Sequence, residues 1–141
     1  MVNNNKYLRY LSLTFIILTL NIIWEFLHYQ LYIDLSGIPS TVHLLMASGA
    51  DILIILCVFL MNSYINKSSS WIYNPKAKDY LITIIICLIV AIFIELRALS
   101  IGRWAYTSSM PTIFGIGLSP LLQLALTSIL GLYLFRRLNK R

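Results

Sequence analysis

Few residues of the chain carry groups that could do chemistry, and most of these lie within long apolar runs. The carboxyl groups of Glu25, Asp51 and Glu95 and the imidazoles of His28 and His43 have predominantly apolar neighbours in the sequence. A carboxyl group that burial keeps protonated near neutral pH can act as a general acid or carry a proton. These five residues are therefore the first candidates for acid–base chemistry.

The spacing of the polar residues indicates which of them share a helix face. Asn21, Glu25, His28 and Tyr32 follow one another at intervals of 4, 3 and 4 residues. Gln123 belongs to a second stripe, in which small or polar residues recur at every fourth position. Side chains three or four residues apart lie on one face of a helix. The spacing therefore predicts polar faces that point into the interior of a helical bundle.

The composition indicates the environment in which these helices lie. Hydrophobic residues make up 59% of the 141 residues, charged residues make up 11%, and the mean hydropathy is +0.80. A soluble domain has about 25% charged residues, and a disordered chain has low hydrophobicity. The composition therefore excludes both classes and predicts an integral membrane protein whose main partner is the lipid bilayer.

Four apolar stretches are long enough to cross a bilayer, which requires about 20 residues. Each should be a helix, because backbone polar groups in hydrocarbon must be hydrogen-bonded internally. The connecting segments contain glycine, proline or serine and are expected to be loops. We predict an all-α membrane protein, a four-transmembrane-helix bundle that forms a single domain over residues 1–141, with helices at about 10–32, 41–65, 80–98 and 111–135.

The basic residues predict the orientation of this bundle. Nine of the eleven Lys and Arg residues fall on the side of the two termini, and only Arg97 and Arg103 fall on the other side. The positive-inside rule then places both termini in the cytoplasm. This topology accounts for the net charge of +6, so a nucleic-acid partner has no support.

The ionisable residues within the predicted spans lie at the membrane midplane or on its outer side. Asp51 is near the midplane, Glu25 and Glu95 are in the outer third, and His43 begins the second span from the outer side. The inner half of the bundle is expected to be plain hydrocarbon with a few weakly polar side chains. Ionisable groups inside a membrane mark functional sites by default. We therefore expect a polar cavity that opens toward the outer face.

The expected roles in this cavity follow from residue type. We assign acid–base catalysis to Glu25, Glu95, Asp51 and His28, and contact with a lipid-soluble small molecule to Trp24, Arg103, Trp104, Tyr106, Gln123 and Asn21. Arg103 is the expected free partner for a carboxylate. A purely structural network that ties the helices together is the alternative.

The chain also contains signs of an internal repeat. Similar residues recur 70 or 72 positions apart: Glu25 with Glu95, Pro39 with Pro111, and Asp51 with Gln123. Both helical hairpins would start on the inner side. The hypothesis is therefore a parallel repeat about an axis along the membrane normal, in which a proline opens the second helix of each hairpin.

A metal site is a second hypothesis for the same residues. Glu25-x-x-His28 matches the spacing that di-iron carboxylate bundles use, and His43 and Asp51 could add ligands for iron, zinc or manganese. The motif occurs once, whereas those bundles use it twice. The cofactor therefore stays undetermined from the sequence.

Two resemblances extend this picture. The segments WEFLHYQLY, IELRALSIGRWAYTSSMP and GLSPLLQ resemble a family of small four-helix bacterial inner-membrane proteins without assigned function. The Trp24-Glu25 pair is similar to a pair in integral-membrane terpene and carotenoid cyclases. That likeness implies Glu25 as the proton donor, Asp51 or Glu95 as its partner, and Trp24 and Tyr29 as rings that stabilise a cation.

Three classes of function stay open at this level. The first is acid–base chemistry on an isoprenoid-like or other lipid. The second is a structural or partner subunit of a membrane complex, for which an oligomer or a protein partner is left open. The third is a component for proton or metal transport, which the expected lack of ionisable groups in the inner half disfavours.

Overall fold

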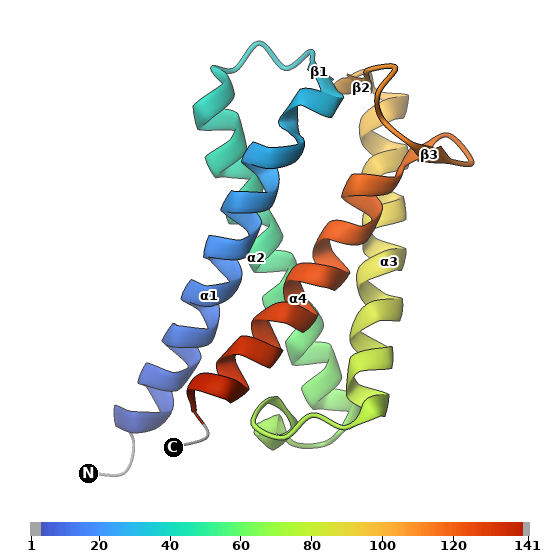
Figure 1. The fold of residues 1–141 in the computed structure, drawn as a ribbon. Helices are drawn as coiled ribbons and strands as arrows, with labels where there is room; N and C mark the ends of the chain where they lie inside the picture. Colours follow the sequence, from blue (N-terminus) through green and yellow to red (C-terminus); the bar gives the residue numbers. More distant parts are fainter. Residues whose placement is uncertain (1–3, 140–141) are drawn as a thin grey trace.

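Four long helices form the bundle, as the hydropathy of the sequence predicts (Figure 1). The structure is a computed structural model that describes residues 4–139. All four helices are long and apolar enough to cross a membrane, so the protein is an all-α four-helix membrane bundle. The helices are α1 (Asn4–His28), α2 (Ser40–Ile65), α3 (Ala77–Ser100) and α4 (Leu118–Leu138).

The two ends of the bundle differ in structure. One end carries both ends of the described chain and the connection between α2 and α3, which includes the 3-10 helix η2 (Ser69–Ile72). We call it the terminal end. The opposite end carries short strands, and we call it the sheet end. Lys140 and Arg141, which contribute to the predicted charge asymmetry, lie outside the described residues.

The first and third connections, expected to be loops, pair with each other at the sheet end. After α1 a short 3-10 helix, η1 (Tyr29–Leu31), leads into β1 (Tyr32–Asp34), which pairs antiparallel with β2 (Trp104–Tyr106). The prediction that the first helix continues to Tyr32 was therefore wrong. The chain leaves the helix because hydrogen bonds to a strand about 72 residues away replace the intrahelical ones. Hydropathy depends only on local composition and cannot predict such pairing.

The fourth helix begins at Leu118, so its predicted start at Pro111 was also wrong. The residues before it form a hairpin of β3 (Thr112–Ile113) and β4 (Ile116–Gly117). Phe114 and Gly115, between these strands, have φ values of 51° and 79°. Positive φ at both central residues is the requirement of a two-residue type I′ turn. An apolar window cannot distinguish such a hairpin from a helix.

The core between α1 and α4 depends on close backbone approach. A Cβ atom added at Gly131 of α4 would lie 2.5 Å from Cγ1 of Ile17 on α1, and Ile17 is completely buried. Small residues permit this kind of crossing in membrane bundles. The contact holds α4 close against α1, and Figure 1 shows the two helices approaching each other toward the terminal end.

Burial follows the predicted internal repeat along α1 and α3. Five buried positions of α1 have buried counterparts 70 residues later: Leu13 and Thr83, Ile17 and Cys87, Asn21 and Ala91, Glu25 and Glu95, His28 and Ala98. The two helices therefore present equivalent faces to the interior. The proposed equivalence of the two prolines fails, because Pro39 directly precedes α2 whereas Pro111 precedes a hairpin.

The terminal end is more polar than the sequence suggests. Asp79, in the first turn of α3, is 1% exposed and accepts hydrogen bonds from the Asn66 side chain and the Lys76 backbone, each at 2.8 Å. The side-chain amide of Asn62 donates to the Asp79 carbonyl at 2.9 Å. The expectation of plain hydrocarbon in this half was wrong here, because a predicted helix start at Tyr80 left Asp79 in a loop.

Candidate functional site

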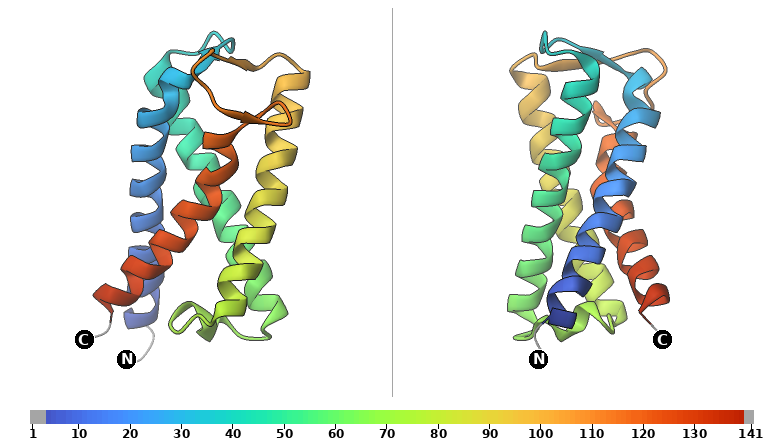
Figure 2. Two further views of the ribbon diagram at one scale, coloured as in Figure 1. Left: turned by 45° about the vertical axis from the view of Figure 1, so that its right-hand side comes forward. Right: turned by 90° about the vertical axis from the view of Figure 1, so that its left-hand side faces the viewer.

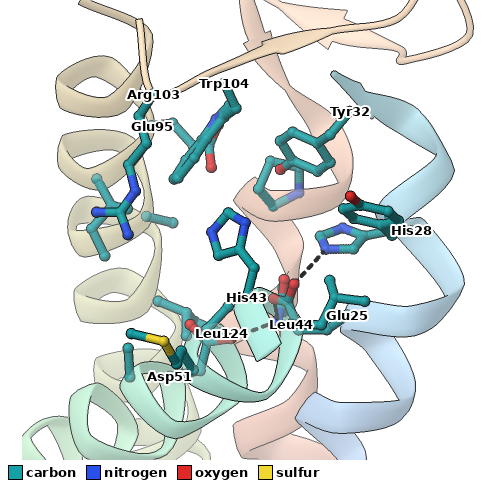
Figure 3. A pocket seen from close by; sticks show the side chains of 18 of the residues that line it. Glu25, His28, Tyr32, His43, Leu44, Asp51, Glu95, Arg103, Trp104 and Leu124 are labelled. Atoms are coloured by element: carbon teal, nitrogen blue, oxygen red, sulfur yellow. Dashed lines mark hydrogen bonds and ion pairs between the residues drawn. The ribbon is translucent and has the colours of Figure 1, made fainter. Parts of the chain in front are cut away.

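A pocket of about 320 Å³ lies within the sheet end of the bundle (Figure 3). All four helices contribute to its lining, together with residues of η1, β1 and β2 and Arg103, which directly precedes β2. Apolar residues such as Ile54, Ala91 and Leu124 form its inner wall. Ligand pockets in proteins typically enclose about 300–1,000 Å³, so this one suits a small molecule or one part of a longer molecule.

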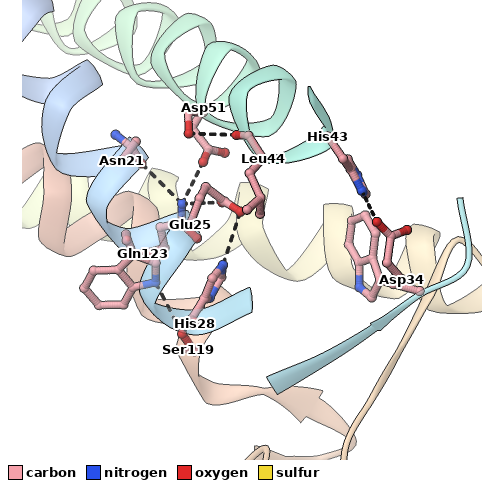
Figure 4. A network of polar contacts seen from close by, with 12 residues as sticks. Asn21, Glu25, His28, Asp34, His43, Leu44, Asp51, Ser119 and Gln123 are labelled. Carbon is pink, nitrogen blue, oxygen red and sulfur yellow. Dashed lines mark hydrogen bonds and ion pairs between the residues drawn. The ribbon is translucent and has the colours of Figure 1, made fainter. Parts of the chain in front are cut away.

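Glu25 and Asp51 meet at the inner part of this pocket through a shared amide (Figure 4). The Nε2 atom of Gln123 donates to Oε1 of Glu25 and to Oδ2 of Asp51, both at 2.7 Å. The two carboxyl oxygens therefore lie within twice that distance of each other. Three helices supply these three groups, so the amide joins α1, α2 and α4 at one point.

Two further polar side chains lie next to the amide on the side of the terminal end. The side-chain oxygen Oδ1 of Asn21 lies 3.4 Å from Nε2 of Gln123 and accepts a hydrogen bond from the hydroxyl of Thr127 at 3.3 Å. Asn21 is completely buried, and its own side-chain nitrogen donates to the carbonyl of Ile17. Asn21 therefore holds the amide of Gln123 in place without lining the pocket.

His28 connects Glu25 to the start of α4. Its Nε2 atom lies 3.3 Å from Oε2 of Glu25, and its Nδ1 atom lies 2.8 Å from the hydroxyl of Ser119. The indole nitrogen of Trp24 donates to the same hydroxyl at 3.3 Å. The predicted ligand-binding residue Trp24 thus lies behind His28, outside the pocket lining. Ser119 was expected on the same helix face as Gln123, but its contacts with His28 and Trp24 were not predicted.

Glu95 lines the opposite wall and has its own pair of donors. Its Oε2 atom accepts hydrogen bonds from the indole nitrogen of Trp104 at 3.3 Å and from the hydroxyl of Tyr106. Trp104 lines the pocket, whereas Tyr106 lies behind Glu95. Burial and the hydrogen bond to Glu95 raise the pKa of the Tyr106 phenol, so it remains a donor at neutral pH. Two donors on one oxygen stabilise the ionised form of a carboxyl group.

A His–Asp pair lines the pocket near the sheet end of the bundle. The Nδ1 atom of His43 lies 2.6 Å from Oδ2 of Asp34, and the backbone of Ser36 donates to Oδ1 of Asp34 at 2.8 Å. Burial alone would raise the pKa of Asp34, but the hydrogen bonds from Ser36 and His43 outweigh burial and hold this pKa at about 2. Asp34 is therefore ionised at neutral pH and fixes the ring of His43, whose other nitrogen remains available to the pocket.

Tyr32 lies on the interior side of the bundle, as its spacing from His28 predicted. It lines the pocket, with its ring 5.2 Å from that of His28 and 6.0 Å from that of Trp104. Burial, followed by the nearby Glu95 carboxyl, raises the pKa of its phenol. Its hydroxyl has no hydrogen-bond partner within residues 4–139. The helical spacing that singled out Tyr32 was a usable signal, although Tyr32 lies in a strand.

The structure gathers the four predicted catalytic residues into one pocket. Of the predicted ligand contacts, three line it (Arg103, Trp104 and Gln123) and three lie behind lining residues (Trp24, Tyr106 and Asn21). Arg103, expected to partner a carboxylate, forms no ion pair within the described residues and instead lies 5.9 Å from the centre of the Trp104 ring.

The metal hypothesis gains no geometric support from the part of the chain that the structure describes. No group of three or more His, Cys, Asp and Glu residues is arranged there to hold a metal ion. Of the four suggested ligands, His43 turns to Asp34 instead of joining the other three.

Comparison of the chain with known protein families, characterised proteins and solved structures finds no match. The chemistry of the site therefore has to be argued from its geometry. Glu25 and Asp51, close together in apolar surroundings, are suited to hold a proton between them. Glu95 on the facing wall instead accepts hydrogen bonds from Trp104 and Tyr106. The pocket thus places carboxyl groups with different hydrogen-bond partners on facing walls.

Proposed function

We propose that this protein is a membrane-embedded acid–base catalyst that acts on a lipid-soluble substrate with an isoprenoid-like or similar apolar chain. The observation that carries the proposal is that three helices each bring one carboxyl group to a single apolar pocket, and that these groups have different donor sets. Paired titratable groups in contrasting environments are typical of acid–base catalysis. Isomerisation, cyclisation or hydration of a double bond fits this arrangement.

In the proposed mechanism the Glu25–Asp51 pair supplies the proton. Both acids accept a hydrogen bond from Gln123, but only Glu25 also contacts His28, which favours its ionised form, so Asp51 is the member of the pair that gives up a proton to a bound chain. Glu95 lies across the pocket, where it stabilises positive charge on the substrate and accepts a proton from a second carbon atom of the substrate. His28 orients Glu25 through its contact at 3.3 Å.

The proposed location follows from the basic residues. We place both termini in the cytoplasm of a bacterial cell and the sheet end on the outer side of the inner membrane. Lys67, Lys76, Arg136 and Arg137 lie toward the terminal end, whereas Arg97 and Arg103 lie at the sheet end. This distribution is typical of bacterial inner-membrane proteins.

The test is a comparison of lipid extracts by mass spectrometry. One culture expresses the wild type, a second expresses the double variant Glu25→Gln and Glu95→Gln, and a third expresses Asp79→Asn. Asp79 is a buried acid at the opposite end, so this variant controls for the loss of a buried carboxylate. We expect a lipid species that depends on the wild type and on Asp79→Asn but disappears with the double variant. Identical extracts from folded proteins would contradict the proposal.

One observation favours a second candidate function, a non-catalytic subunit of a membrane complex. The Gln123 amide ties three helices together, which is sufficient reason to keep Glu25 and Asp51 for stability. Identical lipid extracts would support this candidate. Transport through the bundle has less support, because Ile17, Ile55 and Leu132, each 0% exposed, fill the core toward the terminal end.

A further inference from the structure

The pocket has an opening between α2 and α3. Met46 and Ala50 of α2 and Ile94 of α3 line the pocket, yet all three are also exposed on the surface of the bundle. Met46 is 58% exposed and Ile94 is 37% exposed. Residues with both properties lie at an entrance. Because these helices lie in the bilayer, this entrance faces hydrocarbon chains instead of water.

The course of α2 explains this opening. At the terminal end α2 is fastened to α3, since the Asn62 amide donates to the carbonyl of Asp79 at 2.9 Å and to the hydroxyl of Thr83 at 3.1 Å. Toward the sheet end α2 moves away from α3 to lie beside α1 (Figure 2). The α2 side chains at the opening include Ala47 and Ala50, which are too small to close it.

The charges on the pocket wall favour a positively charged ligand. Four acids line the pocket, and Arg103 is the one Lys or Arg among its lining residues. The Arg103 side chain is exposed and lies against Trp104. Charges in apolar surroundings interact more strongly than in water. A cation that reaches Asp51 and Glu95 would therefore be held electrostatically.

Aromatic rings provide a second attraction for the same kind of ligand. Tyr29, Tyr32 and Trp104 line the pocket, and the rings of Tyr32 and Trp104 meet edge to face at 90°. Aromatic faces attract quaternary ammonium groups. The rings and the acids surround one space of about 320 Å³, which suits a compact head group while the attached chain extends through the opening.

We propose that this pocket binds a lipophilic monocation, an alkyl chain with a compact quaternary ammonium head, which enters sideways from the bilayer between α2 and α3. The inference goes beyond the proposed catalysis, because such a ligand carries its charge on arrival and requires no proton transfer. The head lies among Asp51, Glu95, Tyr32 and Trp104, and the chain passes Ala50 into the surrounding lipid.

Binding of radiolabelled dodecyltrimethylammonium tests this inference. The full chain is placed in phosphatidylcholine nanodiscs, and uptake by empty nanodiscs is subtracted. The neutral isostere 2,2-dimethyltetradecane, in which carbon replaces nitrogen, controls for shape. We expect the cation to bind at least about tenfold more tightly than the isostere, because charge-assisted contacts favour only the cation.

Matched variants test the charge and the route. We expect Glu95→Gln to weaken binding about tenfold, because it removes the negative charge on the wall facing the Glu25–Asp51 pair, and Asp79→Asn to leave binding unchanged. Ala50→Phe should block the opening, whereas Leu53→Phe, at a residue that is 65% exposed and does not line the pocket, should not. Equal binding of the cation and the isostere, or equal effects of the two Phe variants, would overturn the inference. A protein that alters lipids but fails to bind the cation would support the proposed catalysis and contradict this inference. A protein that binds the cation but leaves the lipids unchanged would support this inference and contradict the proposed catalysis.

Discussion

Asp51 and Gln123 are hydrogen-bonded to each other at 2.7 Å and lie 72 positions apart in the chain. Tyr32 and Trp104, whose rings are in contact, are also 72 positions apart. In the parallel repeat that the sequence predicts, equivalent residues would touch each other only close to the axis that relates the repeats. Both contacts fit an axis that passes through the pocket, along the length of the bundle.

The pairing of the two strands has the same geometry. Ile33 of β1 pairs with Ala105 of β2 at the centre of the short sheet, again 72 positions apart. The two halves differ at the site, since one supplies an acid, Asp51, where the other supplies an amide, Gln123. This difference makes the site asymmetric, with Glu25 and Asp51 joined by Gln123 on one side and the separately hydrogen-bonded Glu95 on the other.

The bridging role of Gln123 leads to a prediction on stability. Gln123→Met keeps the length of the side chain but removes the donor for Glu25 and Asp51. We expect a loss of about 1–2 kcal/mol in the free energy of unfolding, because two buried carboxyl groups lose a partner. Thermal unfolding in detergent, followed by circular dichroism, measures the effect. The control is Gln30→Met at an exposed residue. Equal stabilities of the two variants would contradict the bridging role.

The sequence is sufficient to predict the helical spans and the gathering of the acids. Composition and span length predict four helices, and the intervals of three and four residues bring Glu25 and His28 onto one interior face. Their predicted depths, the midplane for Asp51 and the outer third for Glu95, bring both acids into the same half of the bundle as Glu25. These features depend on local periodicity, which a single sequence displays directly.

Features that depend on pairing between distant segments could not be predicted. The contact of β1 with β2 and the hairpin around Phe114 depend on tertiary hydrogen bonds. For the same reason the roles of Asp34 and Ser119 were not predicted, since their partners come from other elements. Asp79 was placed in a loop because the predicted third helix began one residue too late to include it.

Two glycine substitutions should have opposite effects on stability, because only Gly131 lies at the contact between α1 and α4, whereas Gly49 of α2 has open surroundings. Gly131→Ala would place a methyl group 2.5 Å from Cγ1 of Ile17, so we expect a loss of about 1–3 kcal/mol from overpacking. Gly49→Ala meets nothing within 4 Å and should gain up to about 1 kcal/mol from helix propensity. Thermal unfolding of both variants in one detergent tests the contrast.

A double variant identifies the cause of the first effect. Ile17→Ala removes the atom that the new methyl group would strike, so its combination with Gly131→Ala should cost less than the sum of the two single changes. Strict additivity would show that the loss does not arise from this contact.

The Asp34–His43 pair predicts a loss of stability in acid. The folded-state pKa of Asp34 is about 2, below the ordinary aspartate value of 3.8. A lowered carboxyl pKa contributes stability that is fully present above the unfolded value and disappears as the pH falls through the folded value. The stability advantage of the wild type over Asp34→Asn should therefore shrink between about pH 4 and pH 2. Unfolding temperatures of both proteins across this range measure it, and a constant difference would contradict the assignment.

The proposed orientation predicts the activity of reporter fusions at the two ends of the bundle. Gly37 lies at the sheet end, where its φ of +71° and open surroundings mark an exposed turn. Asn74 is exposed at the terminal end. Alkaline phosphatase folds only outside the cytoplasm, where its disulfides form. A fusion at Gly37 should therefore be active and one at Asn74 inactive, with protein levels compared by immunoblot. The reverse pattern would place the pocket entrance in the cytoplasmic half of the membrane, and the distribution of basic residues would then need another explanation.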